Sequence, residues 1–403
     1  MDTPGHADFG GEVERIMNMV DGVLLVVDAY EGTMPQTRFV LKKALEAHVK
    51  PIVVINKVDR PVVRISEVMD EVLELFMELG ADDDQLDFPT VYVSALNGTS
   101  SLDPDINTQV HNMDCLFDMI VKEIPAPIVD TADGLQFQPS LLDYNDYVGR
   151  IGIGRVERGK VHVNDNVTCV RADGTLTKFR IQKLFTFLGL HRIEVEELDA
   201  GDIGAIAGLA DIGVGETVCD NAHIDPLPLL HVDEPTIQMV FGTNTSPFAG
   251  KEGKFVTASK LEARLLRETN KDVSLKVERV PNKEEWIVSG RGELHLSILI
   301  ETLRREGYEL QVARPHAIIR EINGVKMEPF EDVYIEAPDD CIGSVIESLG
   351  LRRGIMENMD SENGMTKVDY IVPSRGLIGF MTNFLTMTRG YGIINHTFRE
   401  YRP

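Results

Sequence analysis

Positive charge and cysteine are both scarce in this sequence of 403 residues. Lys and Arg number 40 against 65 Asp and Glu, which leaves a net charge of -25. The four cysteines are scattered and form no CxxC pair, so neither a disulfide framework nor a zinc site is indicated. This cysteine usage fits a reduced, cytoplasmic compartment. The cysteines are Cys115, Cys169, Cys219 and Cys341.

Long apolar runs are missing as well. Runs such as Val23–Val27 are far shorter than the roughly 20 residues that span a bilayer. No basic stretch followed by an apolar one opens the chain, so we expect no secretory signal and no membrane partner. A chain of 403 residues with 43% hydrophobic content is too long for one core and predicts three or four domains.

The negative charge is unevenly distributed along the chain. Residues 1–125 hold 9 Lys and Arg against 23 Asp and Glu, and residues 126–230 hold 9 against 16. Residues 231–403 hold 22 against 26 and are therefore nearly balanced. Because phosphates attract positive charge, any contact with RNA is expected in this last part.

Two short motifs near the beginning carry the clearest chemistry. The first, Asn56-Lys57-Val58-Asp59, follows a buried, β-branched strand expected over residues 51–55. Polar side chains at the carboxyl end of a parallel strand lie where α/β sheets bind ligands. An Asp at this place can accept hydrogen bonds from N1–H and the 2-amino group of guanine, which adenine lacks. The motif therefore predicts guanine binding, with the Lys along the base and the Asn linking neighbouring loops.

The second motif is Asp2-Thr3-Pro4-Gly5-His6. An Asp that leaves a buried strand can hold Mg²⁺ through water, and a glycine lets a backbone N–H approach a γ-phosphate. The His then stands where an attacking water is oriented, the role of a Gln in other GTPases. The alternative is a Pro-Gly turn that opens a helix with the His on the surface. The GTPase interpretation is favoured because a third segment follows the strand expected over residues 90–93, namely Ser94-Ala95-Leu96.

No phosphate-binding loop of the form GxxxxGK[ST] occurs in the 403 residues. The nearest match runs from Gly154 to Val161. It ends in a residue that cannot ligate Mg²⁺, and it lies among alternating strands instead of opening a helix. No strand precedes Asp2 either. By comparison with GTPases, we expect the first strand, the phosphate-binding loop and switch I to be missing through N-terminal truncation.

The stretch Asp28–Thr37 resembles a translational GTPase, and later stretches at 244–254, 290–295 and 369–380 are similar to the BipA (TypA) family. The resemblance extends from Asp2 to about Tyr401. It implies a GTP-hydrolysing factor that uses GTP, GDP and Mg²⁺. It further implies that this factor binds the ribosome through rRNA and ribosomal proteins, as a cytoplasmic monomer acting in ribosome assembly and stress adaptation. The family continues into a further RNA-contacting domain, which we expect to be absent here.

The motifs and the resemblance together assign roles to individual residues. His6 is expected to be catalytic, and Asp2 is expected to hold Mg²⁺ through water. The expected GTP-binding residues are Asp2, Thr3, Pro4, Gly5, His6, Asn56, Lys57, Val58, Asp59, Ser94, Ala95 and Leu96.

The pattern of apolar residues divides the chain into four parts. Residues 1–125 alternate as βα units of an incomplete P-loop-type GTP-binding domain. Residues 126–230 show short strands with Gly and Asp-Gly turns, which predict a β-barrel similar to translation factor domain II. Residues 231–313 and 314–403 each follow the ferredoxin-like order β-α-β-β-α-β and resemble domains III and V of elongation factor G. The two units align at an offset of 84 residues, which pairs Ile287 and Thr302 with Ile371 and Thr386.

The connection between the two ferredoxin-like units is too short for the extra domain that an elongation factor G-like translocase inserts there. A LepA-like elongation factor also lacks this insert and remains an alternative. A second alternative concerns function. Without a phosphate cradle, the chain by itself is a non-hydrolysing fragment that binds the ribosome or RNA.

Basic residues in the last two units are candidates for RNA contact. Lys251 and Lys254 lie on a Gly-rich loop that suits phosphate contact but carries no base code. The alternative is an ordinary mobile surface loop. Arg291 and Arg375 are weaker candidates because each can pair with a nearby Glu. His295 shows neither a partner carboxylate nor metal-ligand spacing, so we expect it to pack at the start of a helix.

Overall fold

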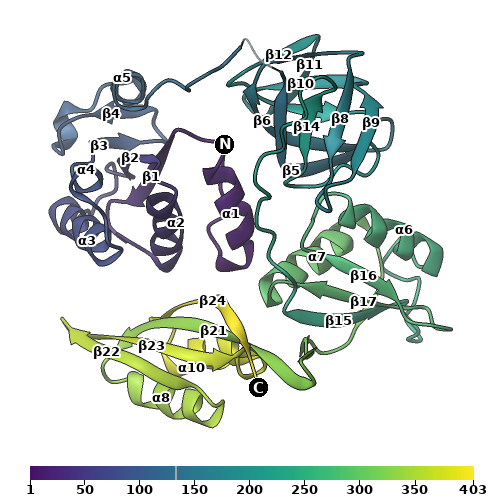
Figure 1. Ribbon diagram of the computed structural model, residues 1–403. Helices are drawn as coiled ribbons and strands as arrows, with labels where there is room; N and C mark the ends of the chain where they lie inside the picture. Colours follow the sequence, from purple (N-terminus) through teal and green to yellow (C-terminus); the bar gives the residue numbers. More distant parts are fainter. Residues whose placement is uncertain (132–133) are drawn as a thin grey trace.

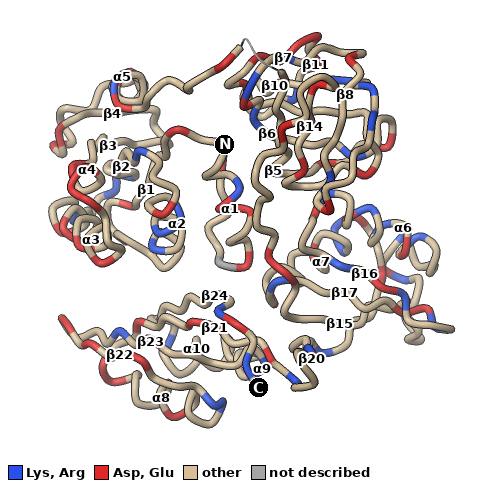
Figure 2. Tube along the Cα trace, viewed as in Figure 1, with Lys and Arg blue, Asp and Glu red and all other residues tan. Residues whose placement is uncertain are grey.

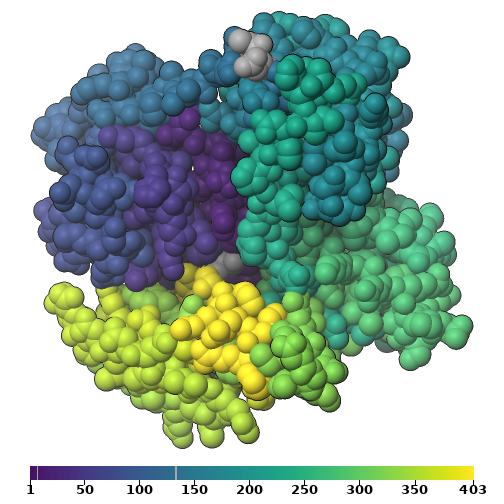
Figure 3. Space-filling model, viewed as in Figure 1, coloured from purple at the N-terminus to yellow at the C-terminus, as the bar shows by residue number. Residues whose placement is uncertain are grey.

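The computed structural model describes residues 1–131 and 134–403 and arranges them as four units around one short helix, α1 (Gly10–Met17). The chain passes from the first unit through the β-barrel and the third unit to the fourth, which returns beside the first (Figure 1). The space-filling view shows the fourth unit packed directly against the first (Figure 3). Among the described residues, no helix is long and apolar enough to cross a membrane.

The first unit is a small α/β layer. Three parallel strands and one antiparallel strand lie in the order β1-β2-β3-β4. Helices α2 and α3 pack on one face of this sheet, and α5 packs on the other. The elements are β1 (Gly22–Asp28), α2 (Pro35–Glu46), β2 (Lys50–Asn56), α3 (Ile65–Glu78), α4 (Asp83–Leu86), β3 (Thr90–Ser94), β4 (Thr99–Ser101) and α5 (Asp114–Glu123).

Local signals explain most of these helix and strand bounds. α2 starts at Pro35, where a missing N–H costs nothing because the first turn has no acceptor for it. The exposed run of Asp residues from Asp82 to Asp84 follows the end of α3. Asp82 caps the start of α4, because its carboxylate accepts the amide of Gln85 at 2.8 Å.

The second unit is the predicted barrel, whose main sheet has the strand order β11-β10-β13-β6-β5-β14-β8-β9. Gly154 is required beside a register shift between the antiparallel strands β5 and β6, because a Cβ there would lie 2.0 Å from the Gln138 carbonyl oxygen. The strands are β5 (Gln136–Asn145), β6 (Gly149–Arg158), β7 (Lys160–His162), β8 (Asn166–Val170), β9 (Leu176–Arg180), β10 (Lys183–Leu188), β11 (His191–Val195), β12 (Glu197–Asp199), β13 (Ile203–Ala207) and β14 (Thr217–Asp220).

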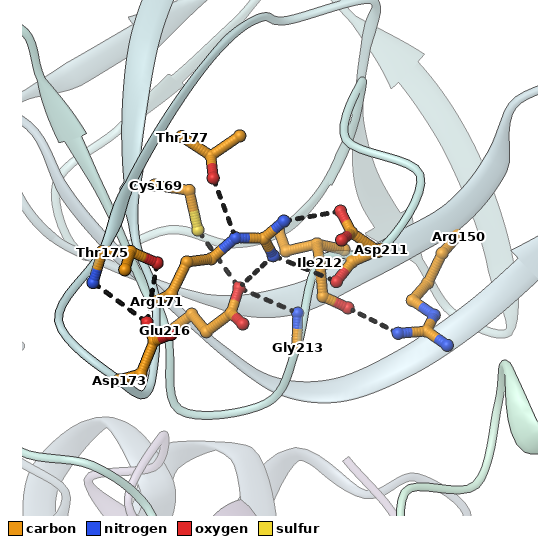
Figure 4. A network of polar contacts seen from close by, with 10 residues as sticks. All are labelled: Arg150, Cys169, Arg171, Asp173, Thr175, Thr177, Asp211, Ile212, Gly213 and Glu216. Carbon is orange, nitrogen blue, oxygen red and sulfur yellow. Dashed lines mark hydrogen bonds and ion pairs between the residues drawn. The ribbon is translucent and has the colours of Figure 1, made fainter.

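A partly buried ionic network joins the ends of β8 and β9 to the segment before β14 (Figure 4). The guanidinium of Arg171 lies between Asp211, at 2.6 Å, and Glu216, at 2.9 Å. The thiol of Cys169 donates to the same Glu216 carboxylate, and burial together with this contact raises the pKa of the thiol. A protonated, buried thiol is a poor nucleophile, so Cys169 is unsuited to nucleophilic chemistry.

The third and fourth units are both ferredoxin-like, as predicted. Numbering the strands of each unit along the chain, both sheets have the order 2-3-1-4. The third unit contains β15 (Ile237–Gly242), α6 (Ala258–Thr269), β16 (Lys276–Arg279), β17 (Glu285–Gly290), α7 (Glu293–Glu306) and β18 (Gln311–Val312), followed by β19 (His316–Ala317) and β20 (Arg320–Ile322). The fourth contains β21 (Val325–Pro338), α8 (Ile342–Leu351), β22 (Ile355–Glu362), β23 (Met365–Pro373), α9 (Ser374–Leu377), α10 (Phe380–Met387) and β24 (Ile393–Arg402).

The sequence pattern missed one break in the fourth unit. The apolar pattern of residues 377–388 is typical of one continuous helix, but α9 and α10 are separate. Gly379 lies between them with φ +73, a left-handed conformation that ends one helix and reorients the chain before the next. Apolar periodicity continues across the break, because both helices pack on the same core, and periodicity alone therefore does not show it.

Candidate functional site

The predicted guanine-binding motif lies at the carboxyl edge of the first sheet. β1 and β2 are parallel, and their register places Asp28 beside Asn56. The Asn56 side-chain oxygen accepts the amide of Lys57 at 2.8 Å and the amide of Ala95 at 3.0 Å. This pair of contacts links the loop after β2 to the loop after β3, as the sequence predicted for Asn56.

Asp59 stands at the same edge. One of its carboxylate oxygens accepts the side-chain amide of Asn97 at 3.2 Å. Asn97 was not foreseen, because it follows the Ser94-Ala95-Leu96 segment and belongs to no recognised motif. The amide donor uses one lone pair of the carboxylate and leaves lone pairs on both oxygens available, so the carboxylate is oriented without being neutralised.

Lys57 contacts the end of β1 at this edge. Its ammonium lies 2.9 Å from Asp28, and Arg60 approaches the same carboxylate at 3.4 Å. Partial burial alone would raise the pKa of Asp28, but hydrogen bonds from the amides of Tyr30 and Glu31 and from Lys57 lower it to about 2. Asp28 therefore stays ionised and holds Lys57 at the strand end. The sequence singled out Asp28 only as part of the family resemblance.

The second motif, residues 2–6, lies against α2 and the fourth unit. A Cβ on Gly5 would touch Gln36, at the start of α2, at 3.4 Å. In the part of the chain that the structure describes, no hydrogen bond or ion pair joins residues 2–6 to residues 56–59. The expected roles are base contact at residues 56–59 and phosphate contact at residues 2–6, and these roles do not require a direct contact between the two motifs.

His6 has a defined protonation pattern. The amide of Asp8 donates to its Nδ1 at 3.1 Å, so the proton of the neutral ring is on Nε2. Burial lowers the pKa of His6, with Asp8 opposing the shift and the neighbouring His396 adding to it. The ring centroids of His6 and His396 are 6.0 Å apart. A neutral His6 in this tautomer can donate to a water from Nε2 and cannot take a proton there.

The residues after His6 enter a buried junction with the third unit. Asp8 is only 5% exposed, and its carboxylate accepts the amide of His295 at 3.1 Å, in the first turn of α7. Gly292 precedes that helix with φ -174 and makes room for the carboxylate, because a Cβ there would lie 2.3 Å from it. A carboxylate at this place satisfies a free N–H and faces the positive end of the helix.

His295 packs at the helix start, as predicted, but the expectation that it lacks a partner carboxylate was wrong. Its Nδ1 accepts the amide of Arg291 at 3.1 Å, and its Nε2 is 2.5 Å from Asp272. Burial would raise the pKa of Asp272, yet the bond from His295 lowers it far below its usual range. The partner lies 23 residues earlier, beyond the reach of any local spacing rule.

The fourth unit contributes a second histidine–carboxylate pair to this junction. Nδ1 of His396, in β24, lies 2.8 Å from Glu331, in β21. Burial acts to lower the pKa of His396, but the Glu331 carboxylate raises it to about 9. His396 is therefore an imidazolium at neutral pH. Nothing in the sequence pointed to this pair, whose members are 65 residues apart.

The four residues expected to contact RNA have three different environments. Lys251 and Lys254 are exposed on their loop. Arg375 forms a two-point contact with Glu328, at 2.5 and 3.2 Å, which is the pairing that the sequence left open. Arg291 lies over the ring of Phe9 at 5.1 Å, and its buried Nε and Nη1 have no hydrogen-bond partner. Two of the three guanidinium nitrogens are therefore buried in the junction.

A metal site formed by the protein alone is not found. Among the described residues, no group of three or more His, Cys, Asp or Glu side chains could hold a metal ion. Mg²⁺ at nucleotide sites uses one or two protein ligands together with phosphates and waters. The exposed carboxylate of Asp2 fits such a role as a ligand through water.

Family models match four segments of the chain. They are the Elongation factor Tu GTP binding domain over residues 1–126, Elongation factor Tu domain 2 over 149–219, Elongation Factor G, domain III over 254–314, and Elongation factor G C-terminus over 325–403. A crystal structure of a protein from Thermus thermophilus is similar in fold, with a TM-score of 0.63 and 16% sequence identity. The match covers 99% of this chain and 86% of the Thermus chain. That match supports the fold alone.

Curated relatives match the whole chain at much higher identity. The "Large ribosomal subunit assembly factor BipA" of Bacillus subtilis is 60% identical over 404 residues, and its namesake in Salmonella typhimurium is 53% identical over 402. The chain covers 66% of each of these two proteins. The namesake in Synechocystis is 52% identical over 406 residues and is 67% covered. The chain thus spans about two thirds of the length of these relatives.

Proposed function

This chain belongs to the BipA family, and from that premise we propose that it is part of a GTP-hydrolysing factor that binds the ribosome and assists assembly of the large subunit. The relatives' names supply the ribosomal partner. On this proposal the protein acts in the cytoplasm as a monomer, uses GTP, GDP and Mg²⁺, and serves stress adaptation.

The observation that carries the proposal is the strand-end geometry around Asn56 and Asp59. The two loops are linked through the amide of Ala95, and the carboxylate of Asp59 is oriented by Asn97. A carboxylate held in this way at the carboxyl edge of parallel strands suits the two donors of guanine and has no complement in adenine. Guanine selection is therefore the most specific chemistry that these residues support.

His6 is proposed to position the attacking water for hydrolysis. Its neutral form carries the proton on Nε2, because Nδ1 accepts the amide of Asp8. Such a ring orients a water by donating to it, and the γ-phosphate oxygens are left to accept the water's proton. Mg²⁺, held by Asp2 through water, would neutralise phosphate charge.

A second candidate function is ribosome or RNA binding without hydrolysis by these 403 residues. Two observations favour it for the chain as it stands. The sequence contains no GxxxxGK[ST] motif, and His6 lies against His396 of the fourth unit. The two candidates differ in whether the chain turns over GTP, and both retain guanine selection at Asp59.

Base selection is tested by exchanging Asp59 for Asn. The chain should bind GDP weakly, because most of the affinity for nucleotides comes from contacts to phosphates, but it should prefer GDP over XDP and ADP. Asp59→Asn removes the acceptor for the 2-amino group and should shift the ratio of GDP to XDP binding about 10- to 100-fold towards XDP, the value of a charged hydrogen bond. Competition among the three nucleotides by saturation-transfer NMR measures this ratio.

Asp83→Asn is the matched control, because Asp83 is exposed in α4 and outside the strand edge. It should leave the ratio unchanged. If Asp59→Asn keeps the parental order of GDP over XDP, Asp59 does not contact the base, and the guanine-site proposal is wrong.

A further inference from the structure

A row of cation–aromatic pairs runs across the third unit to the barrel. The ammonium of Lys251 lies 5.0 Å from the ring of Phe248, and that of Lys260 lies 4.7 Å from the ring of Phe255. The third pair joins the two units, with Arg267 of α6 at 5.8 Å from the ring of Tyr144 in β5. The tube view shows basic segments along α6, whereas α3 of the first unit is mainly acidic (Figure 2).

The first pair stands on a loop that is already ordered. The carboxylate of Glu309 accepts three backbone amides of this loop, from Gly250, Glu252 and Gly253, at 2.7 to 2.8 Å. These bonds lower the pKa of Glu309 to about 2, so the brace is ionised at neutral pH. The loop is therefore braced by one ionised carboxylate. Phe248 nevertheless remains 67% exposed.

The second pair is built on a short strand contact next to this loop. The amide of Phe255 donates to the carbonyl of Gly307, and the amide of Glu309 donates back to the carbonyl of Phe255, both at 3.0 Å. The rings of Phe255 and Tyr308 are in contact, with centroids 4.8 Å apart and planes tilted by 37°. Glu309, which braces the loop, thus directly follows Tyr308 of the aromatic pair. The first two cation–aromatic pairs therefore form one surface.

The third pair belongs to a groove of about 520 Å³ between α6 and β5. Its lining includes Phe255, Tyr308, Lys260, Arg267 and Tyr144. A hydrogen bond of 2.9 Å from Arg150 to Asn270 fixes the barrel against the end of α6. The other guanidinium arm of Arg150 donates to the carbonyl of Ile212, beside the ionic network of Figure 4. The groove walls are therefore rigidly connected.

The free positive charge of this surface comes from few residues. Arg264 also lines the groove, but Glu268 and Glu306 neutralise it at 2.7 and 2.6 Å. Arg267 shares its charge with Asp146 at 3.5 Å. Lys251, Lys254 and Lys260 are exposed and enter no ion pair among the described residues. Local positive charge next to the exposed ring of Phe248 and the half-buried rings of the groove stands out in a chain whose net charge is -25.

We infer that this surface, from Phe248 to Tyr144, binds single-stranded RNA, with bases stacked on the rings and phosphates on the neighbouring cations. Stacking on aromatic rings with cations along the backbone is how proteins hold unpaired nucleotides without reading their sequence. An acidic peptide could meet the cations but would gain nothing from the flat ring faces. The inference rests on the proposed ribosome-binding function and identifies the RNA as unpaired.

The direct test is binding of a fluorescein-labelled 12-nucleotide oligouridylate, followed by anisotropy. Phe248→Ala should weaken binding about tenfold, the effect of losing one stacked base, and Phe248→Tyr should restore it. Lys251→Ala with Lys260→Ala should lower the slope of log affinity against log salt by about 1.4, because each phosphate contact on a single strand contributes about 0.7. A blunt 12-base-pair RNA duplex should bind more weakly than the oligouridylate.

Two exposed residues of α5 provide matched controls. Phe117 is 58% exposed and the side chain of Lys122 is 77% exposed, and Phe117→Ala and Lys122→Ala should bind the oligouridylate as the parent does. Equal binding by parent and Phe248→Ala, or no binding by the parent, overturns the inference. Equally tight binding of a 12-residue oligoglutamate overturns it in favour of an acidic protein partner.

Co-sedimentation of the same variants with purified bacterial 70S ribosomes separates the two proposals. A parent that sediments with ribosomes but does not bind the oligouridylate keeps the ribosome proposal and loses the RNA surface. A parent that binds the oligouridylate but does not sediment with ribosomes keeps the RNA surface and loses the ribosome as its partner.

Discussion

The ionised pair of Glu331 and His396 places charge inside the junction of the units. The carboxylate overcomes the effect of burial and raises the pKa of His396 to about 9, against 6.5 for a free histidine. A raised folded-state pKa means that the pair contributes its full stabilisation below about pH 6.5 and loses it as the pH rises through about 9. The difference of about 2.5 pKa units bounds this stabilisation at about 3 kcal/mol.

We expect one of the 10 histidines to titrate near pH 9 in a two-dimensional NMR titration. That signal should be absent from His396→Gln and should move below pH 6.5 in Glu331→Gln, because burial without the carboxylate lowers the pKa. A His396 signal that titrates near 6.5 in the parent would show that the pair is not ionised in solution.

At the scale of elements, the helix α7 is capped from outside its own unit. Asp8 satisfies the amide of His295, and Gly292 leaves space for the carboxylate. Gly292→Ala should expel Asp8, since the new Cβ would overlap it, while the extended backbone at φ -174 tolerates any residue. The expected cost is about 1 kcal/mol, the usual value of a lost N-cap.

Hydrogen–deuterium exchange of residues 8–17 and 293–296 measures this effect, and both segments should exchange faster in Gly292→Ala. Gly350→Ala is the control, because nothing lies within 4 Å of a Cβ there and Ala stabilises a helix interior. Combining Gly292→Ala with Asp8→Ala should add little to either change alone, because both remove the same contact. Fully additive effects would mean that the two residues do not act on each other.

The edge strand β1 is a second element with a specific liability. Within the described residues it pairs only with β2, so its other edge is open. Val26 is 56% exposed. It lies on the same face of the sheet as Ile52 and Val54 of β2, and α5 covers that face over these two residues. An open edge with exposed apolar residues promotes association between chains.

Val26→Lys should therefore reduce concentration-dependent aggregation, measured by light scattering, without lowering the midpoint of thermal unfolding. Val27→Lys, at a position that is 1% exposed, is the matched contrast and should lower that midpoint strongly, because it buries an unpaired charge. Unchanged aggregation of Val26→Lys would place the association elsewhere.

At the scale of the whole molecule, strong negative charge restricts where RNA can bind. If Lys251, Lys254, Lys260 and Arg267 each neutralise one phosphate, affinity for the ribosome should fall about 50-fold between 50 and 200 mM KCl, from a slope of about 0.7 per contact. Co-sedimentation across this range measures the slope. Binding that does not change with salt would contradict an electrostatic contact with RNA.

The amino-acid sequence by itself determined the local chemistry and the order of the elements. Strand periodicity and the residues at strand ends were sufficient to place Asn56 and Asp59 at the edge of a parallel sheet. The β-α-β-β-α-β pattern was sufficient for two ferredoxin-like units. These features depend on neighbours within a few residues, through side-chain alternation, helix periodicity and turn conformation.

Only the tertiary structure decided which distant side chains meet. Asp8 and His295 are 287 residues apart, and Arg267 reaches Tyr144 in another unit. The residues involved have no shared periodicity or spacing, because such contacts arise from packing rigid units together after each has formed its own core. The same reason explains why His6 was predicted as a catalytic residue from its motif, while its contact with His396 was not.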